Sequence, residues 1–134
     1  MGTKYEFTDE TMYFEGHILH RIKRLSDGQI GSWIEKEENL SQDGDCWVDG
    51  KARVYENAHV YGDAHVYGNA WVYDNAEIYD NAWVGGDVIV YGDAKIYGNA
   101  QAYGDAKVGG NARIYGDTHV YHDVKVYNND SVND

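Results

Sequence analysis

Apolar and polar residues recur with a period of six from Cys46 to Val132, without a gap. In each hexad an aliphatic residue is followed four positions later by a small residue, as Val66 is by Ala70. From the small residue to the next Tyr the pattern predicts a four-residue strand, whose small and aliphatic residues point inward. The Gly-Asp or Gly-Asn pair that follows accepts the left-handed dihedral angles of a sharp corner. Short strands joined by tight corners predict a β-helix.

Two series of residues form the predicted interior. Val or Ile occupies most aliphatic positions, and Ala occupies most small positions until Asp130. Cys46 belongs to the small series, so we expect it to be buried rather than nucleophilic. At five corners the expected positive φ falls on a residue other than Gly, and a Glu is the least suited of these residues. The five residues are Glu56, Asp74, Asp80, His122 and Asn128.

The aliphatic and small positions resemble those of the hexapeptide-repeat superfamily over about two-thirds of the chain. The resemblance implies an all-β fold, a left-handed parallel β-helix of triangular section with 18 residues per coil, so that fifteen hexads make about five coils. It also implies a threefold homo-oligomer. The segments His17-Ile-Leu-His-Arg-Ile and Asp43-Gly-Asp-Cys-Trp-Val resemble the opening of β-helical proteins of bacteriophages and prophages. That second resemblance implies a phage setting and no particular activity.

Residues 1–41 lack the repeat and form a small β-rich head, ahead of the β-helix of residues 42–134. Strands are predicted over 5–8, 11–15, 17–25 and 29–34, followed by a solvated charge run at 35–38. We expect the head to cover the first coil, whose backbone groups would otherwise be unpaired. His17 and His20 suggest a metal or catalytic site. No Cys or acidic residue of the head stands at a matching spacing, so both are interpreted as partly buried strand histidines.

Composition narrows the classes of function. The 134 residues carry a formal net charge of −12, which argues against direct nucleic-acid binding. The single Cys allows no internal disulfide and fits a reducing compartment. We find no apolar stretch long enough to span a membrane and no signal-peptide core, so we expect a cytoplasmic location in a bacterial host cell. Residues 42–134 hold fifteen acidic and six basic side chains, and mimicry of DNA is an alternative, although these charges lie at corners rather than in one stripe.

The 18-residue period sorts the outward side chains onto three faces. The second and third faces carry columns of Tyr, which suit and stabilise a sheet surface. The first face combines aromatic residues with an absence of Lys and Arg, as the centre of a protein interface does. The predicted binding residues are Trp47, His65, Tyr67, Trp83, Gly85, Tyr103, His119 and Tyr121, with Trp71 and Ile89 on the neighbouring face.

Two features of the first face leave alternatives open. Gly85 removes a Tyr from the position beside Trp83, which leaves space for a partner or for the Trp83 ring itself. The head could also fold back over this face and cover it.

One corner column stacks Asp87, Asp105 and Asp123 on successive coils. Carboxylates about 4.8 Å apart repel one another unless they are bonded or screened. Asp commonly accepts backbone N–H bonds at a turn, which is the interpretation we favour. Weak calcium binding by these oxygens is the alternative, and no other cofactor is expected.

The resemblance raises the possibility of acyltransferase or zinc enzyme activity. The enzymes of that superfamily build a cleft with loops between hexads, and this repeat has no insertion. His59, His65 and His119 fall at outward positions and match no catalytic motif of the superfamily, so we expect no enzymatic activity. The favoured hypothesis is a protein-interaction module of phage type that inhibits a host protein such as a defence factor. The alternative is a self-assembling scaffold that stacks through a C-terminal coil with exposed Val126 and Val132.

Overall fold

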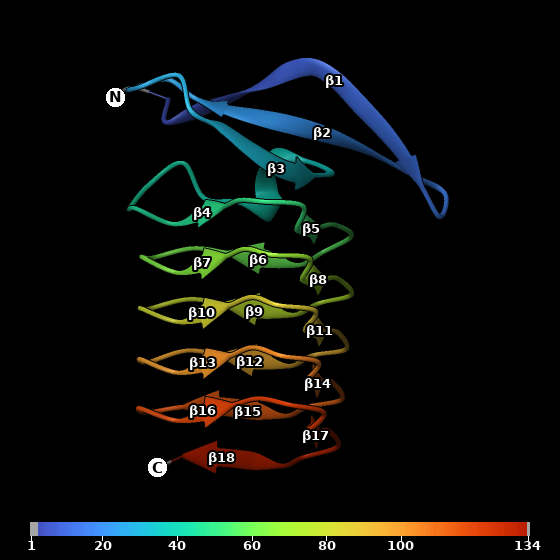
Figure 1. Cartoon of the computed structure of the whole chain (residues 1–134), viewed down its shortest axis with the longest axis vertical. Coiled ribbons are helices and arrows are strands. Elements are labelled where there is room, and N and C mark those ends of the chain that lie inside the picture. The colour runs from blue at the N-terminus through green and yellow to red at the C-terminus, as the bar shows by residue number, and fades with distance from the viewer. Residues whose placement is uncertain (1–2, 134) are drawn as a thin grey trace.

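The computed structural model describes residues 3–133 and is a parallel β-helix with a β-sheet head (Figure 1). The head contains β1 (Tyr5–Phe14), β2 (His17–Arg24), β3 (Ile30–Ile34) and a 3-10 turn, η1 (Glu37–Asn39). The β-helix contains β4 (Trp47–Val48), β5 (Arg53–Val54), β6 (His59–Val60), β7 (His65–Val66), β8 (Trp71–Val72), β9 (Glu77–Ile78), β10 (Trp83–Val84), β11 (Ile89–Val90), β12 (Lys95–Ile96), β13 (Gln101–Ala102), β14 (Lys107–Val108), β15 (Arg113–Tyr115), β16 (His119–Val120), β17 (Lys125–Val126) and β18 (Ser131–Asn133). No helix among residues 3–133 has the length and apolar character needed to cross a membrane.

Each short strand pairs in parallel with the strand 18 residues further along the chain. Trp83 lies beside His65 on one side and Gln101 on the other. The resulting sheets have the orders β4-β7-β10-β13-β16, β6-β9-β12-β15-β18, and β1-β2-β3-β5-β8-β11-β14-β17. In Figure 1 the near strands of the first sheet point right and the fainter far strands of the second point left as the chain descends, so the coil is left-handed. The predicted fold class is therefore confirmed.

The interior is formed by the two series that the hexad pattern predicts. The inward Val, Ile and Ala side chains from Val48 to Ile114 are fully or almost fully buried, and each branched side chain contributes about 1.5–3 kcal/mol on burial. Cys46 is also fully buried, and this burial raises the pKa of its thiol. Its assignment to the interior is confirmed.

The corners show how a carboxylate replaces a glycine. All five predicted corner residues other than Gly have positive φ, from 57° to 61°. At three of them the side chain accepts a hydrogen bond from the backbone N–H one coil further on. Asp80, for example, accepts from the N–H of Gly98 at 3.0 Å. This bond offsets the cost of placing a non-glycine residue in the left-handed region.

The head differs from the prediction in two respects. Residues 5–8 and 11–14 belong to one long strand, β1, which ends before the turn residue Glu15 and pairs with β2 through a register shift between Phe7 and Thr11. The ladder also begins before Ser41, because β3 pairs with β5 and Leu40 pairs with Val60. This adds an irregular coil to the five that the hexads predict, which makes about six. The head shares one hydrophobic core with the β-helix.

The C-terminal coil buries more than the sequence indicates. Val126, which we expected to be exposed, is only 4% exposed, and Val132 is half-buried. The exposed aliphatic residue of this coil, among the residues that the structure describes, is Val124, at 45%. Val88 occupies the same column two coils earlier and is fully buried, so the exposure of Val124 comes from its place in the last coil and not from the size of its side chain.

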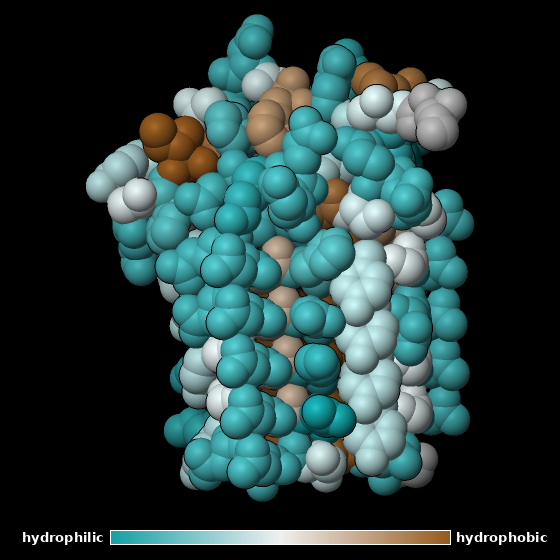
Figure 2. Space-filling model, turned by 180° about the vertical axis from the view of Figure 1, so that it is seen from behind, coloured by the Kyte–Doolittle hydropathy of each residue, from teal (hydrophilic) through white to brown (hydrophobic). Residues whose placement is uncertain are grey.

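The face on the rear of the molecule supports the structural interpretation of the Tyr columns. Figure 2 shows a continuous column of pale side chains running down this face beside hydrophilic rows. Neighbouring Tyr rings there stack with centroids 4.8–5.2 Å apart, from Tyr61 through Tyr79 and Tyr97 to Tyr115. Burial raises the pKa of Tyr61 and Tyr79. The stacked rings cover the sheet and stabilise the register of the coils.

Substitution of Gly98 tests the role of the corner carboxylates. Gly98 has a φ of 67°, and an added Cβ would lie 2.9 Å from the backbone N of Gly116. We expect Gly98→Ala to lower the free energy of unfolding by about 1–2 kcal/mol. Gly98→Asp should cost about 1 kcal/mol less, because its carboxylate can accept the Gly116 N–H. Urea unfolding followed by circular dichroism measures both changes.

Gly16→Ala is the control for this experiment. Gly16 has a φ of 86° and no described atom within 4 Å of an added Cβ, so it reports the dihedral cost alone. An Asp variant at position 98 that is less stable than the Ala variant would contradict the compensating role of the corner carboxylate.

Candidate functional site

The candidate site lies on the sheet formed by β4, β7, β10, β13 and β16, whose outward surface we call the Trp83 face. Trp83 is 46% exposed and Tyr121 is 43% exposed. His119 is also exposed, whereas His65, Tyr67 and Tyr103 are half-buried. The Trp83 ring stacks on His65 with a centroid distance of 4.9 Å and meets the edge of Tyr67 at 5.8 Å. These three residues form an aromatic cluster at the middle of the face.

Gly85 does not leave a vacant space beside Trp83. The ring of Tyr67 leans over Gly85, so that an added Cβ would lie 2.1 Å from a ring carbon. The same arrangement recurs at Gly109, where the Tyr91 ring fills the space at 2.2 Å. A Gly at a Tyr position therefore makes room for the Tyr of the preceding coil, and the expectation of space for a partner or for the Trp83 ring is corrected.

The head covers the top of the Trp83 face. Trp47 is only 3% exposed, because the Arg24 guanidinium lies 4.9 Å from its ring centroid and Tyr5 meets its edge at 6.3 Å. Trp47 is therefore part of the core and is not available to a partner. The alternative that the head folds back over this face is therefore correct for β4, the strand of the face that lies nearest the head.

The neighbouring residues Trp71 and Ile89 are half-buried on the adjacent sheet. The β1–β2 hairpin belongs to the same sheet, and at its turn end Phe14 meets the Trp71 ring with the ring centroids 4.9 Å apart. Trp71 is thus packed within the chain, while Trp83 keeps almost half of its surface exposed.

Acidic residues lie along both margins of the Trp83 face. The outward positions of the five strands carry no Lys or Arg, as the sequence indicates. The corners beside Trp83 and on the coils directly above and below it carry four exposed carboxylates. They are Asp63, Asp80, Asp87 and Asp105. The face is therefore aromatic at its centre and negative at its margins.

A second cluster, around His17, was missed by the sequence interpretation. His17 Nδ1 lies 2.8 Å from Glu35 Oε2, and Nε2 lies 3.3 Å from Glu56 Oε2. The hydrogen bond to Glu35 is the main cause that raises the pKa of His17. Burial opposes ionisation of Glu35, but the bonds from His17 and from the Glu56 N–H outweigh it and lower the pKa of this carboxyl. The sequence signal that could have indicated this cluster was Glu56, because Glu is less suited to the positive φ of a corner than the residues at the other four non-glycine corners.

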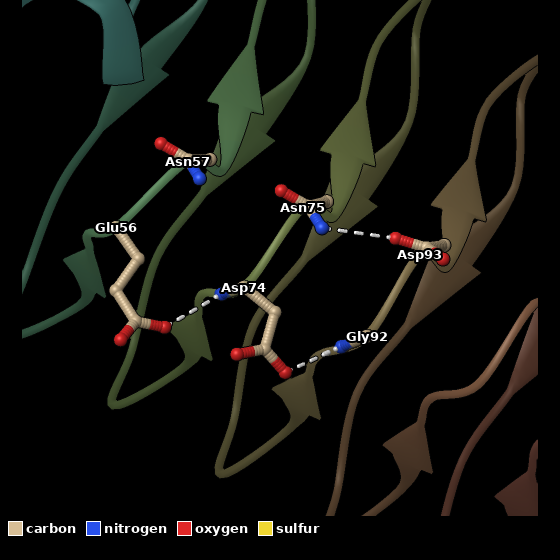
Figure 3. Close-up of a pocket in the computed structure, with 6 residues that line it drawn as sticks. All are labelled: Glu56, Asn57, Asp74, Asn75, Gly92 and Asp93. Atoms are coloured by element: carbon tan, nitrogen blue, oxygen red, sulfur yellow. Dashed lines mark hydrogen bonds between the residues drawn. The ribbon is translucent and has the colours of Figure 1, made fainter.

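The carboxylate chain continues from this cluster into an open groove along the corner column (Figure 3). Glu56 Oε1 accepts the Asp74 N–H at 3.1 Å, and Asp74 Oδ2 accepts the Gly92 N–H at 2.8 Å. Beside them, Asn75 donates to Asp93 at 3.1 Å. Both corner carboxylates thus bond to the backbone and stabilise the coil.

The Asp87, Asp105 and Asp123 column has a different arrangement. Asn69 Nδ2 donates to Asp87 Oδ1 at 3.2 Å, which partners the first carboxylate. Among residues 3–133, no group of three or more His, Cys, Asp or Glu side chains has a geometry that could hold a metal ion. This finding includes the three stacked aspartates and the outward histidines.

Comparison with known proteins gives no assignment, since no protein-family model and no curated protein matches this sequence.

The His17 cluster predicts a pH dependence of stability. The two carboxylates raise the folded pKa of His17 above its ordinary 6.5, so their stabilisation is complete below that value and is lost as the pH rises through the folded pKa. We expect the wild-type protein to lose about 1 kcal/mol of unfolding free energy from this cluster as the pH rises from about 6 through the folded pKa of His17. His17→Gln should remove that loss in urea titrations, and His119→Gln, at an exposed position, should retain it. A pH profile that His17→Gln leaves unchanged would show that the cluster contributes nothing.

The aspartate column predicts a stabilising substitution. Asp105→Asn removes repulsion from Asp87 and Asp123 and supplies an amide that can donate as Asn69 does. We expect the free energy of unfolding to rise by about 0.5–1 kcal/mol at neutral pH. Thermal melts with and without millimolar calcium provide the measurement. A calcium-dependent rise in the wild type that the variant lacks would instead support the metal interpretation.

Proposed function

We propose that this chain is a non-enzymatic, phage-type interaction protein of the hexapeptide-repeat kind that binds and inhibits a bacterial host protein, such as a defence factor, through the Trp83 face. The observation that carries the proposal is the exposed Trp83 in a stacked aromatic cluster on a face without outward cations. Trp and Tyr are enriched among the residues that dominate binding energy at protein interfaces.

The backbone ladder supports this function because it makes the face rigid. His65 N donates to Ala82 O at 3.0 Å, and Trp83 N donates to Ala100 O at 3.0 Å. The side chains of β7 and β10 are therefore held in register by bonds to the coil below. A rigid aromatic surface loses little conformational entropy when a partner binds.

We further propose that the chain assembles as a trimer, as the resemblance to the superfamily implies. Light scattering should then give three times the 15.2 kDa mass of the chain. A trimer that Trp83→Ala dissociates would assign the Trp83 face to self-association instead of to a host protein.

Trp83→Ala tests the binding proposal. The tagged wild-type protein should capture a host protein from bacterial lysate, and mass spectrometry identifies it. With that protein purified, calorimetry should show that Trp83→Ala weakens direct binding by about 30-fold or more, the effect of losing a central aromatic residue. The activity of the host protein should fall when wild-type protein is added and should be unaffected by the variant.

The matched control is Tyr127→Ala. Tyr127 is 48% exposed, close to the 46% of Trp83, and lies on another face of the β-helix. It should bind the host protein as the wild type does, and thermal melts should show that both variants fold. Equal losses from the two variants, or no loss from Trp83→Ala, would contradict the proposal.

A further inference from the structure

Of the four tryptophans of the chain, Trp83 differs from the other three in its contacts with arginine. Three of them have an arginine guanidinium over the ring, at 4.9–5.6 Å from the ring centroid. These pairs are Arg21 with Trp33, Arg24 with Trp47, and Arg53 with Trp71. Among the described residues, no such contact is recorded for Trp83, which is also the most exposed of the four. The chain therefore supplies a cation to every tryptophan except the one at the centre of the candidate face.

Trp47 lies on the same sheet as Trp83, two coils above it, and shows how an arginine binds to a tryptophan ring at this column. Arg24 covers its ring at 4.9 Å and is held by Asp27, whose Oδ2 accepts a hydrogen bond from Nη2 at 2.9 Å. Asp27, and at longer range Asp49 and Asp45, raise the pKa of Arg24, so the surrounding carboxylates favour its charge. At this strand a tryptophan ring and carboxylates that bond to or lie near the guanidinium together hold an arginine.

The surroundings of Trp83 contain the same two components without the arginine. His65 and Tyr67 contact its ring, and Gln101, a residue without a ring, occupies the next coil. Asp80 and Asp87 occupy the corners at either end of its strand and are exposed. An indole ring attracts a cation over its face, and the neighbouring carboxylates add a long-range attraction for it.

We propose that the partner of the Trp83 face is a basic protein segment that places an arginine side chain on Trp83 between the two acidic margins, as Arg24 sits on Trp47. This inference rests on the proposed function and names the chemistry of the partner. Arginine fits better than lysine because its planar guanidinium stacks on an aromatic ring and bonds to carboxylates with two N–H groups at once. Its attraction to the ring is also less opposed by hydration.

Charge decides between this partner and two others. A nucleic acid carries phosphates that the aspartates on both margins would repel. A second copy of this chain would bring its own acidic margins against these, so like-charge repulsion opposes self-pairing through the Trp83 face. A basic protein segment is the occupant whose charge complements the face.

Defined peptides test the proposal without the natural partner. The probes are three labelled octapeptides that alternate serine with arginine, with lysine or with citrulline, a neutral residue of arginine shape. In fluorescence anisotropy at 0.15 M salt, the arginine peptide should bind the wild-type protein more tightly than the lysine peptide, and the citrulline peptide should not bind. Trp83→Ala should weaken binding of the arginine peptide by about 3- to 30-fold, and Tyr127→Ala should leave it unchanged.

An NMR measurement locates the contact on the intact protein. The indole N–H resonance that disappears in Trp83→Ala is the signal of Trp83. It should shift when the arginine peptide is added, while the other three tryptophan signals remain in place. Equal binding to the wild type and Trp83→Ala, or an unmoved Trp83 signal, would overturn the inference, because either result indicates attraction to the overall negative charge alone.

The results of the peptide and host-protein experiments distinguish a failure of the arginine inference from a failure of the proposed function. If Trp83→Ala abolishes binding of the captured host protein while the arginine peptide neither shifts Trp83 nor competes with that protein, the proposed function holds and the arginine inference is wrong. If the peptide binds as expected but no host protein depends on Trp83, the cation-binding inference holds and the proposed function is wrong.

Discussion

The backbone ladder between successive coils is the constraint on which the rest of this structure depends. Each coil bonds to the next through N–H groups such as that of Tyr67, which donates to Val84 O at 2.8 Å. Residues 18 positions apart therefore lie one strand spacing from each other, and every position becomes a column. An inward column accepts only aliphatic or small side chains, because the interior of the triangular coil has no room for others. The repeat in the sequence is the consequence of this geometry.

Because outward residues also stack in columns, the packing of each outward side chain depends on the residue one coil away. Stacked tyrosines support one another, and where the next residue is Gly85 or Gly109 the preceding ring leans into the space. Corner positions follow the same rule, since a carboxylate such as Asp80 bonds to the N–H of the next corner. Local departures from the repeat are thus absorbed by neighbours, and most of them have a structural explanation. Trp83 remains 46% exposed at the middle of its face.

The head decides which part of the aromatic face is available. It places Arg24 over Trp47, and its hairpin turn places Phe14 against Trp71. It is held to the corner column by His17, which bridges Glu35 and Glu56. The surface that remains is centred on Trp83, with acidic corners on both sides. The candidate site is therefore a joint product of the repeat, which positions the rings, and the head, which covers two of the three tryptophans of the β-helix.

The hexad pattern alone predicts the β-helix, the buried series that includes Cys46, and the positive φ at Glu56, because a periodic ladder fixes the environment of each position locally. The 18-residue coil was implied by the family resemblance. The burial of Trp47, the Tyr67 ring beside Gly85, and the contacts of His17 with Glu35 and Glu56 became visible only in the folded chain. These contacts join a head without periodicity to the repeat, or depend on the direction in which a ring leans. Packing between side chains of different segments sets both, and no spacing along the chain encodes it.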